Sequence, residues 1–384
     1  MQSSGSVAGK RVQSIDILRG IVMVLMAIDH VRVYSGLPAG SADPAIFFTR
    51  WITHFCAPAF VFFAGTSAYL YGIRVQTLSK LRRFLLTRGL LLIVLEFTLI
   101  KFFWTFRLEY GSFTLAGVIW MLGCSMIFLA LIIQWKPVAI GIIALVIVFG
   151  QQIFAFVPSL LPEAIRADFA KFWEFIYPSG HEAPKGITIL YVLVPWIGVM
   201  AAGYALGSIL KMETRKRNYW CRLIGFSMIL LFLVIGTIVT TRQSQEDQMP
   251  FLLRLLNQQK YPASELFLMM TLGPLIALVP IADRMKGWLA RVFIVFGRVP
   301  LFYYLLHIPL IHLLALLTNL VRSGQGHNEW YGIAPYVFVE PEQRWNIVLL
   351  YLIFLISVLL LYLACSWYLK YKEKNPDKNW LTYI

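Results

Sequence analysis

The sequence predicts an all-α, polytopic integral membrane protein with about ten transmembrane helices, folded as a single domain over residues 1–384. Hydrophobic residues make up 59% of the chain and charged residues only 14%, whereas a soluble protein carries roughly 25% charged residues. Apolar runs of about 20 residues, the length that crosses a bilayer as a helix, recur along the whole chain. Together these observations exclude a soluble globular protein.

Each predicted helix is an apolar run that ends at a charged or a Pro/Gly/Ser-rich break. The first follows the polar segment 1–13, the basic segment 74–88 separates the second from the third, and Lys136 separates the fourth from the fifth. The basic segment 211–222 precedes the seventh helix, and the tail 370–384 follows the tenth. In order, the predicted helices cover 15–36, 53–73, 84–104, 114–135, 137–157, 187–210, 220–240, 264–282, 292–316 and 346–369.

Two connections between the predicted helices are long, 158–186 and 241–263, and both mix aromatic with acidic residues. We expect each of them to hold a short helix at the membrane surface. The chain shows no sequence repeat of fixed period and no low-complexity tract.

The distribution of charge predicts the orientation in the membrane. An even number of spans puts both termini on one side, and the segments on that side carry 22 Lys+Arg and 5 Asp+Glu. The segments on the opposite side carry 12 of each. The positive-inside rule therefore places residues 1–13 and 370–384 in the cytoplasm.

The net charge of +15 raises the question of nucleic-acid binding, but the basic residues form no single groove or domain. We expect no nucleic-acid partner and assign the positive charge to contacts with membrane lipids. The four cysteines lie singly, without a CxxC pair or metal-ligand spacing, so we expect no metal. Residues 1–12 lack the apolar core of a cleaved signal peptide.

Four of the six histidines fall in the outer halves of predicted helices: His30, His54, His307 and His312. Ionisable groups inside a bilayer are costly and usually face the bundle interior or a wet cavity. Three helices far apart in sequence thus bring imidazoles to one depth, which predicts a site there. Asp29 follows the same argument, and we expect it to pair with His54 or Arg32 because it points about 100° away from His30.

Arg19 and His30 lie eleven residues apart on the first predicted helix, so they share one face and are separated by roughly 16 Å. The permanently charged, fork-shaped guanidinium suits a phosphate, and the imidazole suits proton transfer or nucleophilic chemistry. The structural alternative is that His30 joins two helices by a hydrogen bond. We interpret the pair as a path for a long donor molecule that extends through the bundle.

The string SIDILRGIVMVLMAIDHVR, followed by THFCAPAFVFFAGTSAYLYG, carries this Arg/His pair. An Arg, ten intervening residues and a His on the first span resemble the signature of the membrane-bound acyltransferase-3 proteins. The fuller string is more similar to bacterial proteins related to the heparan-α-glucosaminide N-acetyltransferase catalytic domain. VLVPWIGVMAAGYALG and FGRVPLFYYLLHIPLIH look like later blocks of the same family, so the resemblance spans residues 14 to about 312.

This resemblance implies transfer of an acetyl or similar acyl group from cytosolic acyl-CoA to a sugar amine or hydroxyl across a bacterial inner membrane. Carried over residue by residue, the resemblance implies His30 as the catalytic histidine, and the depth argument above adds His54, His307 and Asp29 as further catalytic candidates. It likewise implies Arg19 for the phosphates of acetyl-CoA or another acyl-CoA, and we add Arg298, Arg82 and Arg83 as phosphate candidates because they lie on the predicted cytoplasmic side. The alternatives are that His54 caps its helix and that Arg82 and Arg83 are lipid-facing determinants of topology.

Two other classes of protein fit the same helices: a proton-coupled secondary transporter and a glycolipid-handling protein without chemistry. The chain lacks the inverted repeat and the paired broken helices that are typical of many transporters. The acceptor, the acyl chain length, and the choice between direct transfer and an acyl-enzyme intermediate stay open. A homo-oligomer is also compatible with the sequence.

Overall fold

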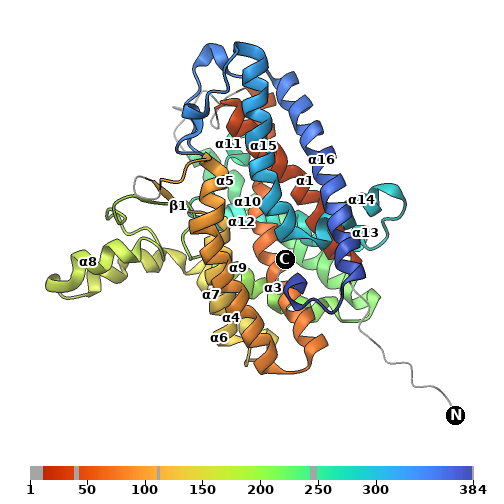
Figure 1. Ribbon diagram of the computed structural model, residues 1–384. Helices are drawn as coiled ribbons and strands as arrows, with labels where there is room; N and C mark the ends of the chain where they lie inside the picture. The colour runs from red at the N-terminus through yellow and green to blue at the C-terminus, as the bar shows by residue number, and fades with distance from the viewer. Residues whose placement is uncertain (1–11, 39–42, 110–112, 243–248, 383–384) are drawn as a thin grey trace.

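The computed structural model describes residues 12–38, 43–109, 113–242 and 249–382, which form a helical bundle with a small parallel sheet (Figure 1). The helices in the first half are α1 (Gln13–Ser35), α2 (Pro44–Trp51), α3 (Cys56–Val75), α4 (Leu78–Leu95), α5 (Lys101–Thr105), α6 (Val118–Ile132), α7 (Pro137–Phe149), α8 (Glu163–Trp173) and α9 (Trp196–Leu210). The helices in the second half are α10 (Thr214–Arg242), α11 (Phe251–Leu256), α12 (Glu265–Ala277), α13 (Val279–Ala282), α14 (Trp288–Arg298), α15 (Pro300–Ser323) and α16 (Ile347–Lys374). Short 3-10 or π-helical segments lie between them: η1 (Ile52–Phe55), η2 (Glu96–Ile100), η3 (Gln151–Leu160), η4 (Asn328–Tyr331), η5 (Pro341–Gln343) and η6 (Asn379–Thr382).

Helix α1 lies inside the bundle, where it packs against α3, α14, α15 and α16 (Figure 1). Its apolar side chains are buried on several faces, as Ile17, Met23 and Val31 illustrate. A helix that is hydrophobic all round is typical of the interior of a bundle. The helix ends at Gly36, whose positive φ of 77° forms the left-handed cap that a residue without Cβ adopts easily.

Glycines allow two pairs of helices to approach closely. Gly65 and Gly203 lie where α3 meets α9, and Gly20 and Gly297 lie where α1 meets α14. A Cβ at any of these four positions would overlap a backbone carbonyl of the facing helix. Small residues at such contacts are typical of membrane bundles, because close backbone approach supplies the packing energy there.

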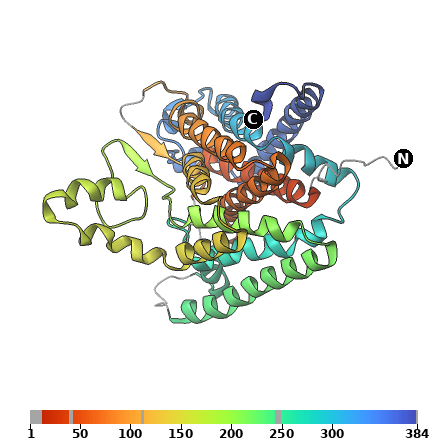
Figure 2. The same cartoon turned by 90° about the horizontal axis from the view of Figure 1, so that it is seen from below.

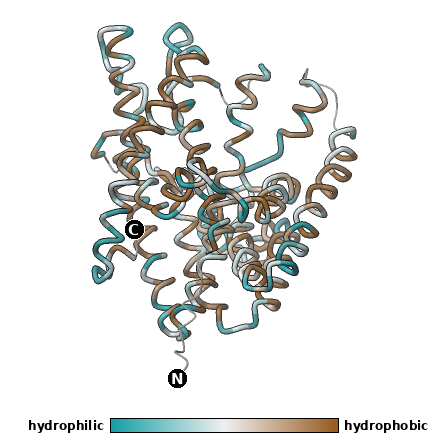
Figure 3. Tube along the Cα trace, turned by 90° about the vertical axis from the view of Figure 1, so that its right-hand side faces the viewer, coloured by the Kyte–Doolittle hydropathy of each residue, from teal (hydrophilic) through white to brown (hydrophobic). Residues whose placement is uncertain are grey.

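Five helical segments of the described chain are long and apolar enough to cross a membrane: Pro44–Val75, Thr214–Arg242, Glu265–Ala282, Pro300–Ser323 and Ile347–Lys374. The pair α7 and η3, bent by 71°, would make a sixth if it counts as one span. Colouring by hydropathy shows apolar stretches along the helices and hydrophilic stretches at many helix ends and connections (Figure 3). The all-α prediction therefore fits, whereas the ten predicted transmembrane helices are not confirmed.

Two predicted helices depart from a regular, continuous α-helix. The region 84–104 contains a π-helical turn at η2, which separates α4 from α5. The region 292–316 is divided at Val299 into α14 and α15, because Pro300 has no backbone N–H to continue the preceding helix. The prediction of one helix over 292–316 was therefore wrong, whereas the region 84–104 stays helical through η2.

The starts of two other predicted helices form strands. Strand β1 (Thr114–Ala116) pairs in parallel with β2 (Ile187–Ile189), with Thr114 opposite Ile187. The run Ile187–Ile189 is β-branched throughout, which favours a strand, and α9 begins only after Pro195. The helices predicted from 114 and from 187 therefore begin several residues later than expected.

The two long connections contain the expected short helices, α8 within 158–186 and α11 within 241–263. Helix α8 projects sideways from the bundle in both perpendicular views (Figures 1 and 2). Figure 2 also shows that α10 lies along one edge of the bundle, where it packs mainly against α12.

Candidate active site

Two histidines from opposite ends of the chain meet between α1 and α15. The Nδ1 atom of His30 lies 2.6 Å from Nε2 of His307, and the two rings stack with centroids 4.6 Å apart. His307 is completely buried, whereas His30 is half-buried. Two of the three imidazoles predicted to share one depth are therefore in direct contact.

The hydrogen bonds of this pair assign its protons. Nδ1 of His307 lies 2.6 Å from the backbone oxygen of Tyr304, and a carbonyl can only accept, so this nitrogen carries the proton. Nε2 of neutral His307 is then an acceptor, and Nδ1 of His30 must donate to it. This assignment leaves the lone pair of neutral His30 on Nε2. Among the described residues, this nitrogen has no hydrogen-bond partner.

Aromatic side chains surround the pair and fix its geometry. Trp104 of α5 packs edge-on against His30 at 4.9 Å between ring centroids. Tyr303 stacks on His307 at 5.3 Å, and its hydroxyl donates to the Met23 carbonyl over 2.6 Å. These contacts hold α15 against α1 at the depth of the two imidazoles.

Asp29 pairs with Arg32 one turn further along α1, at 2.9 Å between carboxylate and guanidinium. The expectation that Asp29 pairs with His54 or Arg32 is therefore confirmed for Arg32. Arg32 also donates to the Leu37 carbonyl at 3.1 Å, so it joins the end of α1 to the following loop.

Lys260 is a residue of this region that the sequence analysis missed. Its ammonium lies 5.2 Å from the ring centroid of Tyr261 and 5.9 Å from that of Tyr191. Burial disfavours the charged form of Lys260, but attraction from Tyr261 and from the Asp29 carboxylate outweighs burial and raises its pKa above the ordinary value. Lys260 lies in a loop, so no helical periodicity identifies it as a site residue. The adjacent Tyr261-Pro262 indicates a turn there but not a functional site.

His54, in η1, has no contact with His30 or His307 among the described residues. It is only 3% exposed, and its ring packs edge-on against Phe267 at 5.4 Å. Neither of its ring nitrogens has a hydrogen-bond partner within the described part of the chain. Lys260 and Asp29 lie within electrostatic range of it. His54 is therefore a buried polar group beside the pair region that lacks a protein partner.

His312 lies five residues beyond His307 on α15, in a different environment. Its Nδ1 donates to the Phe103 carbonyl at 3.2 Å, and its ring stacks on Phe106 at 4.0 Å between centroids. These contacts join α15 to α5, which is a structural role.

Arg19 lies between α1, α3 and α14. Its guanidinium donates to Ser67 Oγ at 2.6 Å, to the Phe63 carbonyl at 3.2 Å and to the Gly297 carbonyl at 3.3 Å. The side chain thus joins three helices about 16 Å along α1 from His30.

The other three arginines implied for phosphate binding lie on two different helices. Arg298, at the end of α14, forms an ion pair of 2.5 Å with Glu373 of α16. Arg82 of α4 donates to the Ala130 carbonyl of α6 at 3.1 Å, and its neighbour Arg83 is exposed. Arg19 binds the carbonyl of Gly297, the residue that precedes Arg298, so these two arginines lie close together. Arg82 and Arg83 lie on α4, which packs against α6.

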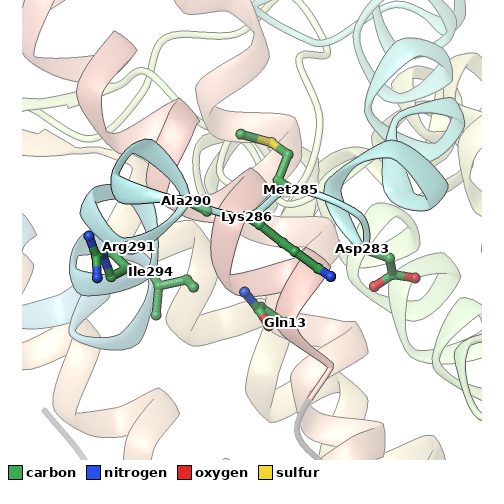
Figure 4. Close-up of a pocket in the computed structure, with 8 residues that line it drawn as sticks. Gln13, Asp283, Met285, Lys286, Ala290, Arg291 and Ile294 are labelled. Carbon is green, nitrogen blue, oxygen red and sulfur yellow. The ribbon is translucent and has the colours of Figure 1, made fainter.

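A cavity of about 320 Å³ opens beside the N-terminal end of α1 (Figure 4). In the close-up, the Lys286 ammonium extends between the Gln13 amide and the Asp283 carboxylate. The residues that line it are Gln13, Asp283, Met285, Lys286, Gly287, Ala290, Arg291 and Ile294. Polar and charged groups therefore face an opening at the end of α1 opposite to His30.

A helical membrane bundle with a hydrogen-bonded histidine pair between two of its helices belongs to the class of integral membrane proteins with an ionisable site in their interior. The family model described as heparan-alpha-glucosaminide N-acetyltransferase, catalytic, matches residues 11–252, which is more than half of the chain. The chain belongs to this family, which indicates a transmembrane acetyltransferase. No curated protein matches the chain.

The family match covers part of the site. It includes Arg19, His30 and His54 but ends before Lys260 and His307. The block FGRVPLFYYLLHIPLIH, which resembled the family in sequence, therefore lies outside the matched residues.

Proposed function

We propose that this protein transfers an acyl group, in the first instance acetyl, from cytosolic acyl-CoA to an amine or hydroxyl of a sugar on the other side of the membrane. The observation that carries the proposal is the His30–His307 pair in a member of an acetyltransferase family. The charge asymmetry of the sequence supports cytoplasmic termini, and the resemblance to bacterial proteins supports a bacterial inner membrane as the location.

The lone pair on Nε2 of His30 is the reactive group of this proposal. In direct transfer, it removes the proton of the acceptor amine or hydroxyl, and the acceptor attacks the thioester carbonyl carbon. The tetrahedral intermediate collapses by breaking the carbon–sulfur bond, and the CoA thiolate takes the proton from His30. In the alternative, Nε2 itself attacks the thioester carbonyl carbon, the carbon–sulfur bond breaks and the CoA thiolate leaves. The acceptor then attacks the acylated imidazole, the bond from the acyl carbon to Nε2 breaks, and the acceptor's proton goes to the thiolate.

His307 assists either route through the 2.6 Å hydrogen bond. As His30 gains a proton or an acyl group, its ring becomes cationic, and the acceptor nitrogen of His307 stabilises that charge. Because Nδ1 of His307 donates its proton to the Tyr304 carbonyl, Nε2 of the neutral ring stays unprotonated. His307 is therefore a positioning residue in this scheme, and His30 is the catalytic residue.

The polar groups around the pair suit the acceptor. His54 has two buried nitrogens without a protein partner, and leaving such groups unpaired costs on the order of 1–3 kcal/mol. A hydroxyl or amine of a sugar supplies the missing hydrogen bonds. Lys260 and the aromatic rings of Tyr261 and Trp104 provide a charged group and apolar faces on which a sugar packs. Asp29 contributes by holding Arg32 and attracting Lys260.

The donor enters at the opposite end of α1 in this scheme. Lys286 at the cavity, together with Arg298 and Arg19, supplies positive charge for the phosphates of acyl-CoA. The extended pantetheine arm then follows the face of α1 that Arg19 shares with His30.

The test uses purified protein in nanodiscs with acetyl-CoA and a panel of amino sugars. Release of the CoA thiol that requires both protein and acceptor, with acetylated sugar found by mass spectrometry, is the expected result. A transporter or a glycolipid-handling protein would release no thiol. That outcome, in protein that binds acetyl-CoA and stays folded, would reject the proposed function.

A further inference from the structure

A groove of about 950 Å³ lies on the outer side of α10, far along the chain from the histidine pair. One wall is α10 itself, and Arg284 from the turn after α13 lies opposite. The lining residues are Glu213, Thr214, Arg215, Asn218, Tyr219, Arg222, Leu223, Phe226, Ser227, Leu230 and Arg284. The groove is thus the meeting place of an exposed helix face and a basic turn.

The face of α10 in this groove changes from charged to apolar along the helix. Tyr219, Leu223, Phe226 and Leu230 follow one another at spacings of four, three and four residues, so they form one stripe. They are 60%, 43%, 60% and 62% exposed, so no other part of the described chain covers the stripe. An uncovered apolar stripe on a helix apolar enough to span a membrane faces lipid chains.

The charged end of the groove carries three arginines, Arg215, Arg222 and Arg284, and one carboxylate, Glu213. All three arginines are exposed, and none forms an ion pair or side-chain hydrogen bond with another described residue. The nearby Asp283 does not neutralise them, because it pairs with Arg217 at 2.5 Å. The end of the groove therefore has an excess of positive charge without a protein counter-ion.

We propose that this groove binds an anionic glycerophospholipid, with its phosphate at Arg215, Arg222 and Arg284 and its acyl chains along Leu223, Phe226 and Leu230. Charge complementarity identifies the headgroup, and the continuous apolar stripe identifies the chains. The stripe from Arg215 to Leu230 rises roughly 22 Å along the helix, which is long enough for a headgroup and most of a leaflet. Tyr219 lies between Arg215 and Arg222 at the phosphate end of the groove, and aromatic residues of this kind mark membrane interfaces.

The groove favours a lipid over a soluble phosphate, because its arginine end is continuous with the lipid-facing stripe. A soluble anion would gain nothing from Phe226 or Leu230. The inference does not depend on the transferase reaction, since no residue of the groove belongs to the histidine pair or to the acyl-CoA contacts proposed above.

The experiment compares the thermal stability of the full chain in nanodiscs of phosphatidylcholine with and without phosphatidylglycerol. The groove variant is Arg215→Gln/Arg222→Gln/Arg284→Gln. The matched control is Lys211→Gln/Lys216→Gln/Lys370→Gln, which removes the same charge from exposed residues that do not line the groove. Native mass spectrometry of the wild-type protein counts the phosphatidylglycerol molecules that remain bound.

We expect phosphatidylglycerol to raise the melting temperature of the wild type and of the control by a few degrees, as a ligand of the folded state does. The groove variant, with a normal melting temperature in phosphatidylcholine, loses this rise, and its affinity for phosphatidylglycerol falls roughly tenfold because three exposed ion pairs are removed. Equal rises in all three proteins would overturn the proposal in favour of general surface attraction. An equal stabilisation by soluble glycerol phosphate, or no retained lipid on the wild type, would overturn it as well.

Discussion

Nδ1 of His30 donates a hydrogen bond to Nε2 of His307 over 2.6 Å, although the two residues are 277 positions apart in the chain. The bond couples the protonation of one imidazole to that of the other. Removing either residue therefore disturbs a unit rather than one independent side chain.

This coupling predicts that the two substitutions are not additive in activity. His30→Ala should lower acetyl transfer by ~10²–10⁴, the usual cost of losing a general base, and leave acetyl-CoA binding unchanged. His307→Ala should lower the rate by a smaller factor, because His30 keeps its lone pair but loses its orientation. The double variant should be about as slow as His30→Ala alone, as measured by CoA thiol release.

The control for this series is His181→Ala, which changes an exposed imidazole whose ring contacts Ser179. Its rate should equal that of the wild type. A double variant in which the two losses multiply would show that the histidines act separately, contrary to the coupled pair.

Lys260 is expected to carry its charge throughout the neutral range, because its pKa is raised. A group with a raised folded-state pKa stabilises the fold below its unfolded pKa, here about 10.4, and loses this contribution as the pH rises through the folded value. The melting temperature of the wild type should therefore exceed that of Lys260→Gln by a constant amount at neutral pH. The difference should shrink only above roughly pH 10.

Lys185→Gln is the matched control, since Lys185 is exposed in another loop. It should melt like the wild type at every pH. A difference between wild type and Lys260→Gln that grows at alkaline pH would contradict the raised pKa.

Arg19 has two separable roles, one structural and one proposed for the donor. Arg19→Ala removes the bonds to Ser67, Phe63 and Gly297 and should lower the melting temperature. If Arg19 also contacts a phosphate of acyl-CoA, calorimetry should show a loss of roughly tenfold to a hundredfold in CoA affinity, from about 1.5–3 kcal/mol for a charge-assisted bond.

Ser67→Ala separates these roles, because it removes one partner of Arg19 and leaves the guanidinium in place. It should lower stability slightly without changing CoA affinity. Equal CoA affinity of the wild type and Arg19→Ala would rule out the phosphate contact and leave the structural role.

The contact between α3 and α9 should be intolerant of a single added methyl group. In Gly203→Ala the new Cβ would overlap the backbone carbonyl of Phe62, so the helices must move apart. Overpacking of this kind costs typically 1–3 kcal/mol, and the melting temperature should fall accordingly. Gly326→Ala is the control, because its Cβ would meet no atom closer than 3.7 Å. Similar melting temperatures for the two variants would contradict the close packing.

The orientation of the chain can be tested with single cysteines in a variant lacking the four native ones. Met212→Cys lies in the connection before α10, and Gln325→Cys lies in the loop after α15; both positions are exposed. An impermeant thiol reagent applied to intact cells should label position 325 and should label position 212 only after the cytoplasmic side is opened. The reverse pattern would invert the predicted topology.

Local features of the sequence were sufficient for the class of protein and for part of the site. Apolar runs and scarce charge indicated a helical membrane protein, and mixed composition indicated the short helices α8 and α11. The spacing of Arg19 and His30 placed them on one face of a helix, because helical geometry depends only on separation along the chain. Breaks such as the one at Val299 were less visible, since a Pro at the start of a helix and a Pro inside one look alike in sequence.

Only the tertiary structure decided which groups meet. Helices α1 and α15 are apolar on most of their faces, so hydrophobic periodicity does not say which face of α1 contacts α15. The contact is decided by the packing of small residues and by polar side chains that need hydrogen-bond partners. His307 accepts a hydrogen bond from His30, Asp29 forms an ion pair with Arg32, and Arg19 donates to Ser67 on α3. Lys260 reaches the site from a loop, where no periodic pattern marks its position, and His54 stays buried without a protein partner.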